Sequence, residues 1–271
     1  MDINQERFLR TEHSVVSMIS IVISSKNESN LLRCQDNIKK TIGVPYEIIV
    51  TENFNGNIPL TKVYNEGANK AKYDYLVFLH EDVIFKTKNW GEKLIKILSS
   101  KNVGAVGVAG STYMPNNGRW YLPGEPFTKG RVIHKSLDKK LDFIALYSRE
   151  LGDHEVVVLD GLFIGTRKDI VKEIPFDEKT FDYFHFYDLD FSLRVAQKYK
   201  VIVTTSILTK HFSHGKYDDV WKKYEDRFLN KHKDILPFTK WSKKPDWNNI
   251  VKPKMQYILY KKDGKLRSKA N

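Results

Sequence analysis

Short apolar runs alternate with longer stretches of helical periodicity along most of the chain. Six runs rich in β-branched or aromatic residues have the length of strands. These runs are Ile19 to Ser24, Glu47 to Thr51, Tyr75 to Leu79, Val103 to Ala109, Val156 to Leu159 and Val201 to Thr204. Apolar residues recur at helical spacing in Glu28 to Thr41 and in Leu60 to Lys72. The resulting β-α-β-α-β order predicts an α/β fold with a mostly parallel central sheet and helices on both faces.

The middle of the chain has a different pattern. From Gly110 to Arg149, glycines, prolines and scattered aromatic residues show little periodicity, which predicts long loops or a short hairpin. A loop of this length in a compact domain is usually functional. Further along, a loop with five aromatic residues precedes a predicted helix that starts near Asp188.

The composition indicates a globular protein without a disulfide framework. With 271 residues, 41% of them hydrophobic, the chain can form one large α/β domain or two small ones. Cys34 is the single cysteine, which is compatible with a reducing compartment. No apolar stretch reaches the roughly 20 residues of a membrane-spanning helix, and Met1 to Ser17 carries charges where a signal peptide would be apolar. We therefore expect a cytoplasmic protein.

The formal net charge of +12 is unevenly distributed. Between Thr239 and Asn271 there are ten lysines and arginines against two aspartates. Such a tail could bind nucleic acid or an anionic membrane surface, and its aromatic residues favour the membrane interface. A solvated terminus without a partner is the alternative. Because the basic excess is terminal and no nucleic-acid-binding motif accompanies it, we expect no nucleic-acid partner.

Polar residues follow the first three predicted strands. In open α/β sheets, ligands bind beyond the carboxyl ends of the strands. Ser24 and Ser25 follow the first strand, Glu52 follows the second, and His80 and Asp82 follow the third. Side chains at i and i+2 can converge on a divalent cation whose remaining positions bind phosphate oxygens. Ordinary turn or capping chemistry would also explain these residues.

Two further clusters could take part in chemistry. Asp188 and Asp190 stand at the start of the predicted helix. One of them is enough for an N-cap, so the other could be a general base. His211 and His214 follow the last predicted strand, and a pair at this spacing could contact a metal or a phosphate. A single histidine is more often structural.

The order of these features resembles one enzyme family. The matching segments, in order, are SIVISSKNESNLLRC, YEIIVTEN, YNEGANKAKYDYLVFLHEDV and YDLDFSLRV. They resemble successive motifs of the nucleotide-sugar-dependent glycosyltransferases of the GT-A fold, close to family 2, over roughly Met18 to Gly215. The sequence departs from the family pattern at three places. His80 stands for the first Asp of the Asp-x-Asp metal motif, Glu52 for the nucleotide-binding Asp, and Tyr187 for the acid before the catalytic Asp.

The resemblance implies a donor side with five residues. Ser24 and Ser25 would lie beside the base and ribose of a nucleotide sugar, and Glu52 would accept hydrogen bonds from them. Lys62 or Asn65 would approach the diphosphate. The expected donor is a nucleotide-diphosphate sugar, with a UDP-sugar as first choice.

The resemblance also implies a divalent cation, Mn2+ or Mg2+. Asp82 would be its chief ligand, and His80 would be a second ligand or would bind the ribose. His211, with His214 as its substitute, would be a later contact to the metal or the diphosphate. An imidazole ligand shifts the preference from Mg2+, which seeks oxygen, toward Mn2+.

On the acceptor side, the resemblance assigns the general base to Asp188. This residue would remove the proton of the acceptor hydroxyl, giving in-line attack and inversion at the anomeric carbon. Asp190 would orient the acceptor or Arg194, and Asp160 with Gly161 would form a turn whose glycine lets the backbone approach the sugar. An aromatic ring of the long loop, such as that of Trp120, would stack on a sugar face or pack in the core.

These features predict a single catalytic domain with two extensions. The expected parts are an arm over residues 1–17, a catalytic domain over 18–238 and a basic aromatic tail over 239–271; the donor half of the domain is 18–110 and the acceptor half 111–238. The implied activity is metal-dependent transfer of a hexosyl or related sugar to a hydroxyl of a glycan or lipid-linked glycan, in surface polysaccharide or glycoconjugate synthesis. The tail would rest on the inner membrane face. A catalytically inactive sugar- or nucleotide-binding protein of the same fold is the alternative.

Overall fold

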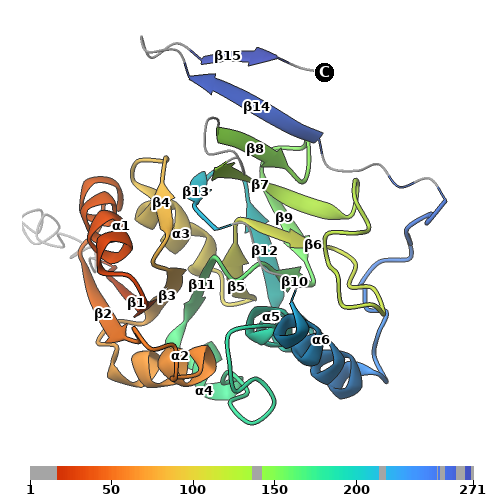
Figure 1. Ribbon diagram of the computed structural model, residues 1–271, viewed down its shortest axis with the longest axis horizontal. Coiled ribbons are helices and arrows are strands. Elements are labelled where there is room, and N and C mark those ends of the chain that lie inside the picture. Colours follow the sequence, from red (N-terminus) through yellow and green to blue (C-terminus); the bar gives the residue numbers. More distant parts are fainter. Residues whose placement is uncertain are drawn as a thin grey trace, which may run out of the picture.

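The computed structural model describes residues 17–135, 142–213, 218–248, 250, 254–260 and 266–269. A seven-stranded sheet forms its centre (Figure 1). In spatial order its strands are β2 (Tyr46–Glu52), β1 (Ile19–Ser25), β3 (Tyr75–His80), β11 (Phe163–Arg167), β5 (Val103–Gly107), β12 (Lys200–Thr204) and β9 (Asp153–Val156). Strand β1 pairs in parallel with β2 and β3, and β12 with β5, whereas β11 and β9 run antiparallel to their neighbours. The predicted mostly parallel sheet is confirmed.

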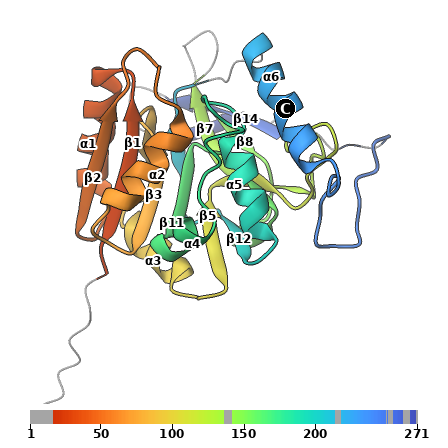
Figure 2. The ribbon, with the colours of Figure 1, turned by 90° about the horizontal axis from the view of Figure 1, so that it is seen from below.

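Helices cover both faces of this sheet. On one side lie α1 (Glu28–Thr41) and α3 (Trp90–Leu98); on the other lie α2 (Leu60–Lys70), α4 (Lys168–Glu173) and α5 (Tyr187–Ala196) (Figure 1). Figure 2 looks onto the side of α2 and α5. Helix α1 begins where Asn27 accepts a hydrogen bond from the N–H of Asn30 at 2.9 Å. Helix α2 packs so closely on β1 that a Cβ on Gly67 would lie 2.3 Å from Val22.

A second sheet lies beside the first. Its strands are, in spatial order, β10 (Val158–Leu159), β6 (Ala109–Ser111), β7 (Thr128–Lys135), β8 (Asp142–Leu146), β14 (Lys254–Tyr260) and β15 (Leu266–Lys269). Strand β13 (Thr209–His211) pairs in parallel with β7 and antiparallel with β4 (Val83–Phe85). The antiparallel pair of β7 and β8 confirms the hairpin alternative for the long middle segment.

Two predicted strands are each divided between the sheets. The run from Val103 to Ala109 leaves the central sheet after Gly107 and enters the second sheet at Ala109. The run from Val156 to Leu159 does the same, because β9 ends at Val156 and β10 belongs to the second sheet. Helix α3 and helix α6 (Asp219–His232) are not among the predicted elements.

The predicted tail takes part in the second sheet, because β14 pairs with β8. Before it, Thr239 donates a hydrogen bond to the carbonyl of Thr112 at 2.8 Å, and Trp241 and Trp247 are exposed. Among the described residues, no helix has the length and apolar character needed to cross a membrane. The domain boundaries and the membrane contact stay predictions.

Candidate active site

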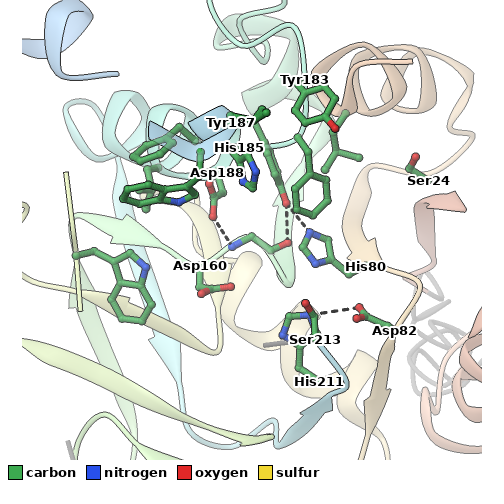
Figure 3. Close-up of a pocket in the computed structure, with 18 of the residues that line it drawn as sticks. Ser24, His80, Asp82, Asp160, Tyr183, His185, Tyr187, Asp188, His211 and Ser213 are labelled. Carbon is green, nitrogen blue, oxygen red and sulfur yellow. Dashed lines mark hydrogen bonds and ion pairs between the residues drawn. The ribbon is translucent and has the colours of Figure 1, made fainter. Parts of the chain in front are cut away.

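A cavity of about 1250 Å³ opens beyond the carboxyl ends of β1 and β3 (Figure 3). The loop between β10 and β11, the first turn of α5 and the end of β13 form other parts of its wall. The predicted site residues that line it are Ser24, His80, Asp82, Trp120, Asp160, Gly161, Asp188 and His211. The structure therefore brings together side chains that are up to 187 residues apart, from Ser24 to His211.

His80, Asp82 and His211 form a cluster on one side of the cavity. One nitrogen or oxygen atom from each lies within 4.8 Å of the other two. Nε2 of His211 lies 3.2 Å from Oδ1 of Asp82, yet among the described residues this buried nitrogen has no aligned hydrogen-bond partner. Two imidazoles and a carboxylate fit a divalent cation, and this donor set favours Mn2+ over Mg2+.

Two of the three side chains in this cluster, His80 and Asp82, are in the protonation state that binds a cation at neutral pH. Burial and the neighbouring His211 lower the pKa of His80 to about 4, so this imidazole is neutral at pH 7. Burial alone would raise the pKa of Asp82, but the contact with His211 outweighs it and lowers the pKa below its ordinary value. Burial by itself would lower the pKa of His211. The negative charges of Asp82 and, to a smaller extent, Asp160 outweigh burial, so the pKa of His211 is raised. Asp82 is thus ionised at neutral pH.

Glu81, between the two predicted ligands, holds the loop after β1. Its Oε2 accepts hydrogen bonds from the hydroxyl of Ser25 at 2.7 Å and from the N–H groups of Lys26 and Asn27 at 3.1 and 3.0 Å. Hydrogen bonds to an ionised acceptor are stronger than those between neutral groups. The end of β1, which carries Ser24, and the loop with Lys26 after it are therefore fastened to the end of β3.

The first turn of α5 packs directly onto Gly161. The N–H of Gly161 donates to Oδ2 of Asp188 at 2.7 Å, and the hydroxyl of Tyr187 donates to the carbonyl of Gly161 at 3.0 Å. A Cβ on Gly161 would lie 2.2 Å from the Tyr187 oxygen and 2.9 Å from Cβ of Asp188. The glycine is thus needed for the approach of α5; it also lines the cavity, and its contact with a sugar stays a prediction.

Asp188 combines a central position with an altered acidity. Burial, together with the negative charge of Asp160, raises its pKa to about 7, although backbone hydrogen bonds such as that of Gly161 oppose the shift. Burial also raises the pKa of Asp160 itself, against the charge of His211. A carboxylate that is partly ionised near neutral pH can accept a proton from a substrate and return it to water.

Five predicted site residues do not line the cavity: Ser25, Glu52, Lys62, Asn65 and Asp190. Ser25 is in register with Glu52 on the neighbouring strand. Successive side chains of a strand point to opposite faces of the sheet. The side chains of Ser25 and Glu52 therefore point to the face opposite that of Ser24, which lines the cavity. Asn53, one residue after Glu52, lines the cavity instead, and its amide binds both main-chain groups of Ile58.

The two predicted residues of α2 lie on the wrong side of that helix. Leu60 and Tyr64 face the cavity. Lys62 lies 3.9 Å from Glu66 along the helix surface. Asn65 donates hydrogen bonds to the carbonyl of Phe176 and to Glu178, and it accepts one from the N–H of Phe176. Lys62 and Asn65 therefore point away from the diphosphate position that we predicted for them.

Asp190 is a structural residue of the interior. It is fully buried, its Oδ1 lies 2.8 Å from Nε2 of His232, and its Oδ2 accepts a hydrogen bond from Nε of Arg194 at 2.9 Å. Burial opposes ionisation, but His232, Arg194 and Lys231 outweigh it and lower the pKa of Asp190. Asp190 therefore contacts Arg194, one of the two partners predicted for it, and its carboxylate is enclosed by Arg194, Lys231 and His232.

Several cavity residues are absent from the sequence prediction. Nζ of Lys26 lies 5.6 Å from the ring centre of Phe184 and 6.0 Å from that of Tyr183. Among the described residues, Lys26 has no carboxylate within ion-pair distance. The position of Lys26 just after the first predicted strand could have marked it as a cavity residue. No local pattern could have marked His134, because only the pairing of β7 with β13 places it opposite His211. His214 lies outside the described residues.

Comparison with known proteins places these features in a family. The crystal structure of GalNAc-T7 with UDP, GalNAc and Mn2+ is similar with a TM-score of 0.51 and 12% identity, over 74% of this chain and 44% of that one. The crystal structure of A197 from STIV gives a TM-score of 0.42 and 14% identity, over 73% of this chain and 86% of that one. No curated protein sequence matches.

The first likeness shows that the chain has the fold of GT-A glycosyltransferases. A family model described as a glycosyltransferase-like family matches residues 17–233, which include every described residue of the cavity wall except Ile250. The chain belongs to this glycosyltransferase-like family.

Proposed function

We propose that the protein is a metal-dependent, inverting glycosyltransferase that moves a sugar from a nucleotide-diphosphate donor to a hydroxyl of a glycan or lipid-linked glycan. One observation carries this proposal: a carboxylate with a pKa of about 7, Asp188, opens on the same cavity as the cluster of His80, Asp82 and His211. Attack of a hydroxyl on an anomeric carbon needs a base that takes the hydroxyl proton and a cation that balances the charge of the diphosphate leaving group. This cavity has a candidate for each.

The donor would lie between the first loop and the cation cluster. Asp82, His211 and His80 would hold the cation, which supplies positive charge against the departing diphosphate. The ammonium of Lys26 provides a second positive charge in this part of the cavity. Ser24 and Asn53, on the β1 and β2 side, would border the base and the ribose. A UDP-sugar with Mn2+ is the first donor to test, in view of the likeness to GalNAc-T7.

The acceptor would lie beside Asp188. Its carboxylate takes the proton of the acceptor hydroxyl, and the acceptor oxygen forms a bond to the anomeric carbon. The bond from that carbon to the diphosphate oxygen breaks, and its electron pair leaves with the nucleoside diphosphate. Trp120 and Tyr147, whose ring centres are 5.2 Å apart, form an aromatic wall that suits the apolar face of a sugar.

The location of the reaction is a separate part of the proposal. We place the enzyme in the cytoplasm, with the segment from residue 239 onward against the inner membrane face. The support is its basic and aromatic composition and the exposure of Trp241 and Trp247. Production of a surface polysaccharide or glycoconjugate would follow from a lipid-linked acceptor at that face.

A donor panel tests the function. The purified protein is incubated with uridine, guanosine and thymidine diphosphate sugars, with Mn2+ or with EDTA, and donor binding and slow donor hydrolysis are both followed. We expect binding and turnover with one donor, turnover that EDTA abolishes, and an Asp188→Asn variant that binds the donor and no longer turns it over. The matched control is Asp36→Asn, an exposed acid paired with Lys40.

Two outcomes would contradict the proposal in different ways. Binding of a donor without turnover in any arm would favour a catalytically inactive sugar- or nucleotide-binding protein. Failure of every nucleotide sugar to bind would reject the donor class itself.

A further inference from the structure

The two ends of the His80 imidazole have different neighbours. Nε2 of His80 lies 2.8 Å from the hydroxyl oxygen of Tyr187. On the other side, the ring centre of His80 lies 5.6 Å from that of His211, and Asp82 completes the cluster. Figure 3 shows the ring of His80 between Tyr187 and the pair formed by Asp82 and His211.

The single hydroxyl proton of Tyr187 determines the direction of its hydrogen bonds. The hydroxyl oxygen lies 3.0 Å from the carbonyl oxygen of Gly161, and a carbonyl can only accept. The tyrosine proton is therefore used for Gly161. The contact with His80 then needs its proton from the imidazole, so Nε2 of His80 is the protonated nitrogen. A neutral imidazole carries one proton, which leaves Nδ1 with its lone pair free.

We propose that Tyr187 is a positioning residue that selects the Nε2–H tautomer of His80, so that Nδ1 is available to bind a divalent cation beside Asp82 and His211. The proposal rests on the metal-dependent function above and deepens it. It also links two departures from the family pattern, since His80 and Tyr187 occupy places where the family has acids. A hydrogen bond from the second ring nitrogen is how metal-binding histidines are commonly oriented.

Packing accounts for the ring of Tyr187 but not for its hydroxyl. The ring lies among Tyr64, Phe176 and Phe184, with centre distances of 5.5, 6.1 and 6.5 Å. Phenylalanine would keep these contacts. Tyr187→Phe therefore separates the hydrogen bond from the packing.

Cation affinity is measured by calorimetric titration with Mn2+ alone, without any nucleotide. Tyr187→Phe should weaken binding on the order of 10- to 100-fold, the usual effect of losing a hydrogen-bond partner of a metal ligand. In a His80→Ala background the same substitution should have no further effect, because the tautomer of an absent ring cannot matter. Tyr199→Phe removes a tyrosine hydroxyl that donates a hydrogen bond to Glu173 outside the cavity wall, and it should leave the affinity unchanged.

The tautomer itself is read by long-range 1H–15N spectra of the metal-free protein labelled at histidine nitrogens. We expect an Nε2–H imidazole for His80 in the unaltered protein and a mixture of tautomers in Tyr187→Phe. An Nδ1–H tautomer in the unaltered protein would overturn the proposal, as would Mn2+ affinity that Tyr187→Phe leaves unchanged or weakens equally without His80. If the unaltered protein does not bind Mn2+ at all, the metal-dependent function fails together with this inference.

Discussion

Asp188 and Asp160 face one cavity, and burial together with the charge of Asp160 raises the pKa of Asp188 to about 7. The two residues come from the start of α5 and from the loop between β10 and β11. Gly161 joins them physically, since it follows Asp160 and donates its N–H to Asp188. Reaction rate and stability should both respond to this arrangement.

The rate should rise with pH until Asp188 is ionised. Well below pH 7, kcat/KM is expected to increase about tenfold for each pH unit, because only the ionised carboxylate can accept the proton. Asp160→Asn removes a negative charge, which lowers the pKa of Asp188 and moves the acidic limb to lower pH. The measurement is a pH–rate profile at saturating Mn2+. An acidic limb at the same pH in Asp160→Asn and in the unaltered protein would contradict this interpretation.

Two aspartates of the same helix should behave in opposite ways on substitution. Asp190→Asn leaves Arg194, Lys231 and His232 without their buried counter-charge, which should lower the free energy of unfolding by about 3–5 kcal/mol. Asp188→Asn should cost no stability at pH 8 while abolishing turnover. Urea unfolding of both variants checks this. Comparable losses of stability in the two variants would remove the distinction between a structural and a catalytic aspartate.

The pH dependence of stability has a definite sign at each of these residues. The pKa of Asp190 is below its unfolded value of about 3.9, so its stabilisation is present above that value and is lost as pH falls through the folded pKa. The pKa of Asp188 is raised to about 7, so ionisation costs stability as pH rises from about 4 to 7. Asp188→Asn should gain stability relative to the unaltered protein over this interval, as unfolding midpoints at several pH values would show.

Gly161→Ala should slow the reaction without unfolding the protein. The added Cβ would lie 2.2 Å from the hydroxyl of Tyr187 and 2.9 Å from Cβ of Asp188, so the first turn of α5 must move. A base displaced by about 1 Å can cost on the order of 100-fold in rate. Donor affinity, measured by calorimetry in EDTA so that the cation cluster does not contribute, should change little, because Ser24 at the end of β1 and Lys26 after it do not contact Gly161. An unchanged kcat would show that the position of Asp188 is not critical.

The variants Lys26→Gln and Lys62→Gln test which lysine contacts the diphosphate of the donor. Lys26 lines the cavity, whereas Lys62 is the residue predicted from the sequence. Loss of a charged contact to a diphosphate should raise the donor Kd about tenfold or more. This effect is expected for Lys26, which lines the cavity, and not for Lys62, which lies beside Glu66 on the outer surface of α2. Donor titrations of both variants at one salt concentration decide between them. Equal effects would place the diphosphate elsewhere.

Much of the central sheet could be predicted because its strands and helices follow local patterns. The apolar runs of β1, β2 and β3 and the periodicity of α1 and α2 are contained within short segments. The second sheet was less accessible, since β7 and β8 lie in a segment without clear periodicity. The divided runs at Val108 and Val157 show the same limit, because an apolar run does not reveal where the chain passes from one sheet to another.

The sequence by itself determined most strands of the central sheet and the polar residues at the strand ends, and hence the candidate roles of His80, Asp82 and Asp188. It did so because hydrophobic periodicity and motif order are properties of neighbouring residues. Only the tertiary structure decided which side chain of each pair faces the cavity, Ser24 rather than Ser25 and Asp188 rather than Asp190. Only the tertiary structure, too, places the hydroxyl of Tyr187 within hydrogen-bond distance of His80. These outcomes depend on strand register and helix packing, which join segments far apart in the chain.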